Sequence, residues 1–241
     1  MPSSLYVALA GQVSMNRRLE TIANNLANMT TPGYRAEEVK FETLLSKTRA
    51  QSVAFPTSGE TYISRRPGPI TYTGNPLDVA TEGNHWFALQ TPDGTVYTRD
   101  GRLKMNEIGE LQSVAGYPVL DPGGAPVRVD PQAGQIVIGD DGSIMQGDRQ
   151  VGGIGVFQLP DNAKLSRYEN SGVMSDEPGV PPQDPIGAGV RQGYLEGANV
   201  NPIMEMTRLI AVTRAFEMAS SAMGQGESTQ DEAIRSLGSP T

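Results

Sequence analysis

Few side chains in this chain have types and spacing that could do chemistry. The 241 residues include one histidine, His85, and no cysteine. An imidazole can act as a general acid or base or bind a metal, but a zinc-type site needs three or four ligands and a nucleophile needs a partner base. His85 lies next to Trp86 in an apolar run, so we interpret it as a packed or surface residue. The sequence predicts no catalytic residue, no cofactor and no metal site.

Two glycine-rich stretches imitate ligand-binding loops. Gly139-Asp140-Asp141-Gly142 lacks the alternating oxygen ligands and the closing glutamate of a calcium-binding EF-hand. Gly152-Gly153-Ile154-Gly155 is not followed by the Lys-Ser or Lys-Thr of a phosphate-binding loop, and no serine lies in a Gly-x-Ser-x-Gly elbow. We predict that the Asp-Gly pairs are hairpin turns. An enzyme is the least favoured class, although scattered carboxylates can converge in three dimensions without a sequence signal.

Charge and hydropathy exclude two kinds of partner. The net charge is −8, and no basic run exceeds the pairs Arg17-Arg18 and Arg65-Arg66, so the sequence predicts no nucleic-acid binding. No segment approaches the roughly 20 apolar residues of a membrane span, which predicts no membrane insertion. The opening Met1-Pro2-Ser3-Ser4 lacks the cationic lead of a secretory signal. If the protein leaves the cytoplasm, we expect export without a cleaved signal peptide.

The strongest pattern is a pair of helical stripes, one near each end of the chain. Their apolar residues recur at steps of three and four, the spacing that turns one side of a helix toward a partner helix. The first stripe comprises Leu5, Ala8, Gln12, Met15, Leu19, Ile22, Leu26 and Met29. The second comprises Met206, Leu209, Thr213, Phe216, Ser220 and Met223, flanked by Ile203 and Ile210. Asn201 is a suitable N-cap for the second helix, and Pro202 suits its first position.

Two interpretations of these stripes remain open. Most such stripes pack on the core of their own domain. Their terminal position and their small or polar members favour a contact between subunits, and the helices would be marginal alone. Asn24, Asn25 and Asn28 lower helix propensity, which indicates another use for them. The predicted subunit-interface residues are Leu5, Ala8, Met15, Leu19, Ile22, Asn24, Asn25, Leu26, Asn28, Met206, Leu209, Ile210, Thr213, Phe216 and Met223.

The region between the helices has the pattern of β-structure. From Asn75 onward, turn signals such as Pro92-Asp93-Gly94 separate short apolar runs, which predicts an antiparallel meander. The predicted fold is therefore α+β, with N- and C-terminal coiled-coil-like helices joined to a central antiparallel β-rich domain. We expect an N-terminal assembly helix over 1–34, a connector over 35–74, the β-rich domain over 75–195, and a C-terminal assembly helix and tail over 196–241. Within the connector, Phe41, Leu44 and Leu45 could extend a helix.

Three separate stretches of the chain resemble one protein family. They are Leu5 to Gly11 with Ile22-Ala23-Asn24-Asn25-Leu26-Ala27-Asn28 and Thr31-Pro32-Gly33-Tyr34; Gly74 to Ala80 with Trp86-Phe87 and Tyr97-Thr98-Arg99-Asp100-Gly101; and Gln192 to Glu196 with Asn199 to Pro202 and Arg214-Ala215-Phe216-Glu217. In this order they are similar to the bacterial flagellar axial proteins of the rod and hook. One departure is Gly224-Gln225-Gly226, which is expected to interrupt the last helix.

The resemblance implies a structural subunit of the flagellar basal-body rod, located in the part that spans the periplasm. Such a subunit is exported by the flagellar type III apparatus and assembles helically with other rod and hook axial proteins to transmit motor torque. Within the family, the chain is most similar to a proximal rod subunit, with a distal rod subunit as the second match. Asn24, Asn25 and Asn28 would then hydrogen-bond between subunits. The alternative from another class is a secreted or phage-tail-like β-rich adhesin with a trimeric coiled coil.

Overall fold

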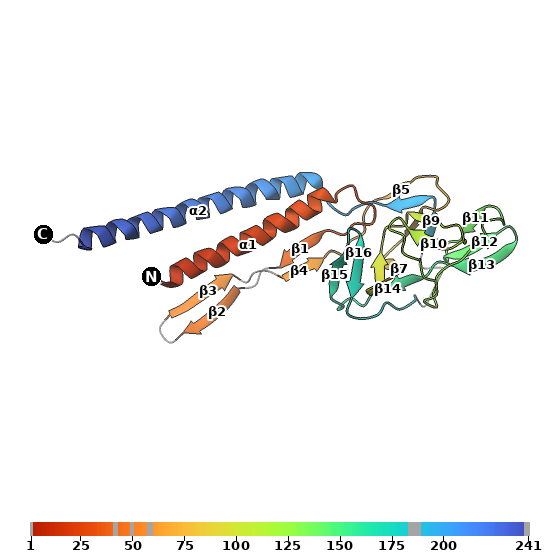
Figure 1. Ribbon diagram of the computed structural model, residues 1–241, viewed down its shortest axis with the longest axis horizontal. Helices are drawn as coiled ribbons and strands as arrows, with labels where there is room; N and C mark the ends of the chain where they lie inside the picture. The colour runs from red at the N-terminus through yellow and green to blue at the C-terminus, as the bar shows by residue number, and fades with distance from the viewer. Residues whose placement is uncertain (1, 41–42, 49–50, 57–59, 183–188, 239–241) are drawn as a thin grey trace. The chain divides into compact units, whose positions relative to one another are not determined.

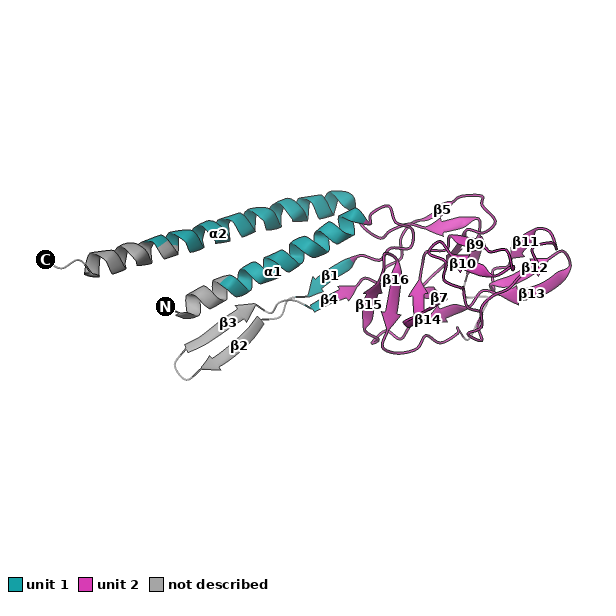
Figure 2. Cartoon of the chain, viewed as in Figure 1, with its two compact units in different colours: residues 1–27, 37–61, 201–241 teal, residues 28–36, 62–200 magenta. Residues whose placement is uncertain are grey.

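The computed structural model describes residues 2–40, 43–48, 51–56, 60–182 and 189–238, and the side chains of 9–40, 60–182, 189–225 and 228. The chain divides into two compact units (Figure 2). Unit 1 comprises residues 1–27, 37–61 and 201–241, and unit 2 comprises residues 28–36 and 62–200. Unit 1 is thus built from three separate stretches of sequence, and unit 2 from two.

Unit 1 contains two long helices, α1 (Pro2–Ala27) and α2 (Pro202–Gly238), which lie side by side and run antiparallel (Figure 1). The Asn201 side-chain oxygen accepts the N–H groups of Ile203 and Met204 at 3.1 and 3.2 Å, so the predicted N-cap of α2 is confirmed. The helix continues through residues 224–226, and the expected interruption there is wrong. Glycine lowers helix propensity by about 1 kcal/mol without forbidding a helix.

The stretch 35–74, expected as a connector, contains five strands. β1 (Glu37–Lys40) pairs with β4 (Glu60–Ile63), β2 (Thr43–Thr48) pairs with β3 (Gln51–Pro56) as an antiparallel hairpin, and β5 (Ile70–Tyr72) follows. The helical extension through Leu44 and Leu45 is therefore wrong, and Phe41 lies outside the described residues. A short apolar run fits a strand as well as a helix, and periodicity alone does not separate the two.

The main sheet of unit 2 has five antiparallel strands in the order β14-β7-β8-β16-β15. A three-stranded sheet, β11-β12-β13, and the pairs β10–β9, β17–β6 and β18–β5 complete the unit. The predicted antiparallel β-structure is confirmed, but the order of the main sheet is not that of a simple meander. The remaining strands are β6 (Val79–Thr81), β7 (His85–Thr91), β8 (Gly94–Thr98), β9 (Leu103–Met105), β10 (Leu111–Ser113), β11 (Ile136–Ile138), β12 (Ser143–Gln146), β13 (Arg149–Gly153), β14 (Val156–Gln158), β15 (Leu165–Tyr168), β16 (Gly172–Ser175), β17 (Val190–Gln192) and β18 (Tyr194–Glu196).

Strand β7 separates two apolar cores. Because successive side chains of a strand point to opposite faces, Trp86 and Ala88 join one buried cluster while Phe87 and Leu89 join the other. All four side chains are buried. The central sheet is therefore covered on both faces by its own unit, as expected for a domain that folds around its own core.

Candidate assembly surface

The two helices of unit 1 face each other along a stripe with steps of four and three. On α2 the buried or half-buried positions include Glu205, Leu209, Val212, Phe216, Ala219 and Met223. On α1, Ser14, Thr21 and Ile22 are buried, and this helix packs against β1 and β3 as well as against α2. The Gln12 Nε2 group donates to Ser220 Oγ across the pair at 3.0 Å. Part of each predicted stripe thus packs against the other helix of the same chain.

The predicted interface residues fall into three groups. Met15, Leu19, Leu26, Asn28, Leu209, Thr213, Phe216 and Met223 are half-buried, Ile22 and Asn25 are buried, and Asn24, Met206 and Ile210 are exposed. The side chains of Leu5 and Ala8 lie outside the described residues, although both positions belong to α1. The half-buried group is thus partly covered within the chain, whereas Met206 and Ile210 are uncovered.

A second stripe on α2 faces away from the packed side. Ile203, Met206, Ile210 and Met218 are each 48–76% exposed. At about 100° per residue, these four positions fall within a third of the helix circumference. On α1, Leu9 and Val13 are half-exposed one turn apart. Exposed apolar residues grouped on one side of a helix indicate a contact with another protein, and the exposed Arg214 and Glu217 share this sector.

Asn25 has a role inside unit 1 that the sequence did not reveal. Its side chain is 2% exposed. The Nδ2 group donates to the Glu37 carbonyl at 2.8 Å, and Oδ1 accepts the Glu37 N–H at 2.8 Å. The Asn25 amide therefore makes one donated and one accepted hydrogen bond to the backbone of the first residue of β1, as a residue of a neighbouring strand would. The structure assigns Asn25 this contact within unit 1, and the expected hydrogen bond between subunits stays a prediction.

A polar pocket of about 230 Å³ lies where α1, β1 and α2 meet. Its lining includes Asn25, Glu38 and the buried Glu205, whose carboxylate pairs with Arg208 at 2.6 Å. Pairing keeps a buried carboxylate from being an uncompensated charge. Across the described parts of the chain, no group of three or more His, Asp or Glu side chains is placed to hold a metal ion.

In unit 2, three charged side chains from distant parts of the sequence meet in the interior. Glu196 Oε1 lies 2.7 Å from Arg35 Nη1, and Glu196 Oε2 lies 2.9 Å from Arg99 Nη1, with all three side chains at most 1% exposed. The same carboxylate accepts the Gly68 N–H at 2.7 Å. The Trp86 ring lies under both guanidinium groups, 5.6 Å from Arg35 and 5.2 Å from Arg99. We call Arg35, Arg99, Glu196 and Trp86 the buried ion cluster.

Two guanidinium groups share one carboxylate in this cluster. Burial and the positive charge of Arg35 lower the pKa of Arg99 to about 10, and Glu196 opposes both effects. Burial also lowers the pKa of Arg35 against the attraction of Glu196. Asn199 adds hydrogen bonds to Ala36 N–H at 2.6 Å and to the Arg66 carbonyl at 2.8 Å. The chain segments that follow α1 and precede α2 are therefore fastened to the same interior site.

Arg99 and Glu196 lie within the motifs that resemble the rod and hook proteins, but the sequence predicted no role for them and did not single out Arg35. The signal that could have found them is a charged residue inside a motif of glycine, aromatic and apolar residues. Gly33 belongs to the same region: its φ is +69°, and an added Cβ would lie 2.1 Å from the Asp100 nitrogen. The Pro-Gly pair thus allows the chain after α1 to pass close to the segment that carries Arg99.

The residues first considered for chemistry occupy ordinary structural positions. His85 Nδ1 lies 3.0 Å from the Glu82 carbonyl oxygen at the start of β7. Asp141 lies in the turn between β11 and β12, where its Oδ1 accepts the Ser143 N–H at 2.9 Å and Gly142 has φ +82°. Hydrogen bonds from Ser143 lower the pKa of Asp141. The prediction of a hairpin turn is confirmed for this Asp-Gly pair.

Three protein-family descriptions match the chain, and the matched residues overlap the three stretches of sequence that resemble the rod and hook proteins. The family description "Flagella basal body rod protein" matches residues 5–35, "Flagellar hook protein FlgE/F/G D1 domain" matches residues 80–146, and "Flagellar basal body rod FlgEFG protein C-terminal" matches residues 191–236. The flagellar basal-body rod protein FlgF of Mesorhizobium japonicum is 51% identical over 99% of each chain. The chain belongs to the flagellar basal-body rod protein family. The first family match covers most of α1, and the last covers most of α2.

Two further relatives place the chain within this rod protein family. FlgF of Rhizobium meliloti is 43% identical over 99% of each chain, whereas FlgG of Bacillus subtilis is 30% identical over 98% of each chain. The prediction of a rod protein most similar to FlgF is confirmed, and FlgG is the more distant of the two. Neither helix described in the structure is long and apolar enough to cross a membrane.

Proposed function

We propose that this rod-family protein is a structural subunit that assembles helically with other rod and hook axial proteins through α1 and α2, and so transmits motor torque. The single observation that carries the proposal is the stripe Ile203, Met206, Ile210 and Met218, which α1 leaves uncovered. These side chains bury little in the isolated chain, so their apolar area is removed from water only when another molecule covers it. A neighbouring subunit of the same tube is the partner that the family implies.

The geometry of the helix pair suits such an assembly. A contact between two different patches of successive copies does not close on itself unless the rotation allows it, so it produces a filament or tube. Each subunit offers an inner stripe that joins its own helices and an outer stripe for its neighbours, which gives the coiled-coil-like packing expected of a tube of helices. The half-buried Met15, Leu19, Leu26, Leu209, Thr213, Phe216 and Met223 would be covered further on assembly, as would Leu5 and Ala8 at the start of α1.

The finer assignments follow from the family. The chain would occupy the proximal rod, with FlgF as its counterpart among the relatives and the distal position of FlgG as the alternative. It would reach the periplasm-spanning rod through the flagellar export apparatus, without a cleaved signal peptide, and would work without catalysis or cofactor. The adhesin alternative is not favoured, because relatives named as rod proteins match the chain over nearly its whole length.

Replacing Ile210 by aspartate tests the proposal. A charge in a contact that becomes dry on assembly costs several kcal/mol unless it is paired, whereas the same residue in the exposed stripe of a free chain costs little. The variant should be exported, keep the thermal unfolding transition of unit 2 and fail to enter isolated basal bodies, while Ile210→Met should incorporate normally. Normal incorporation of Ile210→Asp would contradict the proposed role of α2.

A further inference from the structure

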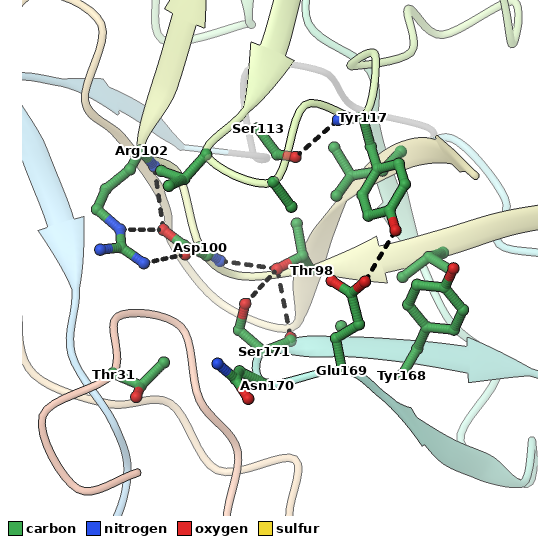
Figure 3. A pocket seen from close by; sticks show the side chains of 15 residues that line it. Thr31, Thr98, Asp100, Arg102, Ser113, Tyr117, Tyr168, Glu169, Asn170 and Ser171 are labelled. Atoms are coloured by element: carbon green, nitrogen blue, oxygen red, sulfur yellow. Dashed lines mark hydrogen bonds and ion pairs between the residues drawn. The ribbon is translucent and has the colours of Figure 1, made fainter. Parts of the chain in front are cut away.

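A pocket of about 200 Å³ opens in unit 2 at one end of the β9–β10 hairpin (Figure 3). Its lining includes the buried Leu89 and Val96 and the exposed Val114 and Ala115. Its volume is below the roughly 300–1,000 Å³ of typical small-molecule sites. The size and apolar depth suit a single aliphatic side chain.

The acidic groups around this pocket are already bonded within the chain. Asp100 accepts two hydrogen bonds from the Arg102 guanidinium, at 2.9 and 2.6 Å. Glu169 accepts the Tyr117 hydroxyl at 2.8 Å, and this bond raises the pKa of Tyr117. Both carboxylates are therefore already hydrogen-bonded to side chains of the same chain. The pocket is therefore suited to an apolar group more than to a cation.

An apolar side chain stands at the opposite end of the same hairpin. Ile108 lies in the turn between β9 and β10 and is 69% exposed, although such turns usually carry polar residues. Asn106 Oδ1 accepts the N–H groups of Ile108 and Glu110 at 3.1 and 2.8 Å. Gly109 has φ +80°, and an added Cβ would lie 1.9 Å from the Val129 oxygen. The turn is thus fixed by hydrogen bonds and close packing, which lowers the entropy cost of using Ile108 in a contact.

We propose that Ile108 of one subunit inserts into this pocket of a second copy of the chain. Leu103 pairs with Ser113 at the end of the hairpin next to the pocket. Met105 pairs with Leu111 at the other end, next to the turn that carries Ile108. Because the inserted residue and the pocket lie at opposite ends of one element, the contact repeats head to tail from copy to copy, as an open helical assembly requires. The inference rests on the proposed rod function and adds a contact between β-rich units to the helix contacts.

Charge placement agrees with this pairing. Glu107, the neighbour of Ile108, is exposed at the tip of the turn. At the pocket rim the exposed Lys104 donates from Nζ to the Val114 carbonyl at 3.0 Å. Glu107 beside the inserted side chain would therefore approach Lys104 beside the pocket, while the Asp100 and Glu169 carboxylates of the lining stay bonded to Arg102 and Tyr117.

Cross-linking tests the contact cleanly, because the natural chain has no cysteine. Cells that lack the unaltered chain would express the Ile108→Cys/Ala115→Cys double variant, and isolated basal bodies would be treated with a mild thiol oxidant. A head-to-tail contact predicts a ladder of dimers and longer products of this chain on a non-reducing gel. The control pair Ile108→Cys/Val137→Cys, which uses another exposed valine of unit 2, should give no ladder.

Other outcomes overturn the proposal. Incorporation without a ladder, or a product whose mass shows a different axial protein, would exclude insertion into a second copy. As an independent test, Ile108→Asn should lower the number of incorporated copies about tenfold, the effect of losing one well-packed contact residue, whereas Ile108→Leu should not. Normal incorporation of Ile108→Asn overturns this contact alone. Absence of the unaltered chain from basal bodies overturns the rod function as well.

Discussion

Arg99 Nη1 and Glu196 Oε2 lie 2.9 Å apart in the interior of unit 2, and the two residues are 97 positions apart in the sequence. The other carboxylate oxygen of Glu196 binds Arg35, which follows α1 in the chain, while Glu196 itself closes β18 shortly before α2 begins. One carboxylate therefore fixes both segments that lead to the helices. The buried ion cluster is the clearest link between the three family-like motifs of the sequence.

Replacing Glu196 by glutamine should strongly destabilise unit 2. The change leaves two buried guanidinium groups without a carboxylate, and removing one partner of a buried ion pair costs about 3–5 kcal/mol. Urea unfolding at neutral pH measures the loss. The matched control is Glu82→Gln, which breaks the half-exposed pair with Arg191 at 2.5 Å and should cost less than about 1 kcal/mol. Equal costs for the two variants would show that the cluster contributes no more than a surface pair.

Replacing Asn25 by alanine should loosen the start of β1. The variant loses both hydrogen bonds to Glu37, at a cost of about 1–3 kcal/mol. Hydrogen exchange at the Glu37 amide should become faster than in the unaltered chain. Asn16→Ala, which removes an exposed bond to Glu20 on the same helix, should leave that amide unchanged. Unchanged exchange in Asn25→Ala would show that the Asn25 amide does not hold the start of β1.

Acid should remove the small stabilisation that Asp141 provides. Hydrogen bonds lower the pKa of this carboxyl below its ordinary value of 3.8, so its contribution is present above that pH and is lost as the pH falls through the folded-state pKa. The difference in unfolding free energy between the unaltered chain and Asp141→Asn should be below about 1 kcal/mol at pH 7, because solvent screens this exposed group, and should shrink in urea titrations as the pH falls through the folded-state pKa. Added calcium should not change the melting temperature of either protein. A calcium-dependent rise abolished by Asp141→Asn would identify a ligand site.

The sequence carried enough information for the terminal helices, because their apolar spacing and the Asn201 cap are local signals. It did not identify Glu205 and Val212, which are buried on the packed side of α2, whereas the predicted Met206 is exposed. Helical spacing alone permits both choices on a 3.6-residue turn. A buried glutamate paired with Arg208 does not look apolar, so hydropathy could not identify the packed side.

Long-range polar contacts were outside the reach of sequence reasoning. The sharing of Glu196 by Arg35 and Arg99 depends on how the strands of unit 2 return to one place, and no spacing rule predicts it. The two-sided bonding of Asn25 to Glu37 depends likewise on the path of the chain after Gly33. The strands β2 and β3 were missed because their short apolar runs carry no period long enough to separate strand from helix.

Methionine oxidation tests directly whether assembly covers the outer stripe of α2. Peroxide converts an exposed methionine thioether to the sulfoxide, and susceptibility follows exposure. Met206 and Met218 are exposed in the chain, and the half-buried Met145 of β12 provides an internal reference for mass spectrometry. Met206 and Met218 should be oxidised readily in the purified chain and protected in isolated basal bodies, while Met145 should behave alike in both. Equal oxidation of Met206 and Met218 in the free and assembled protein would contradict the assignment of α2 as an assembly surface.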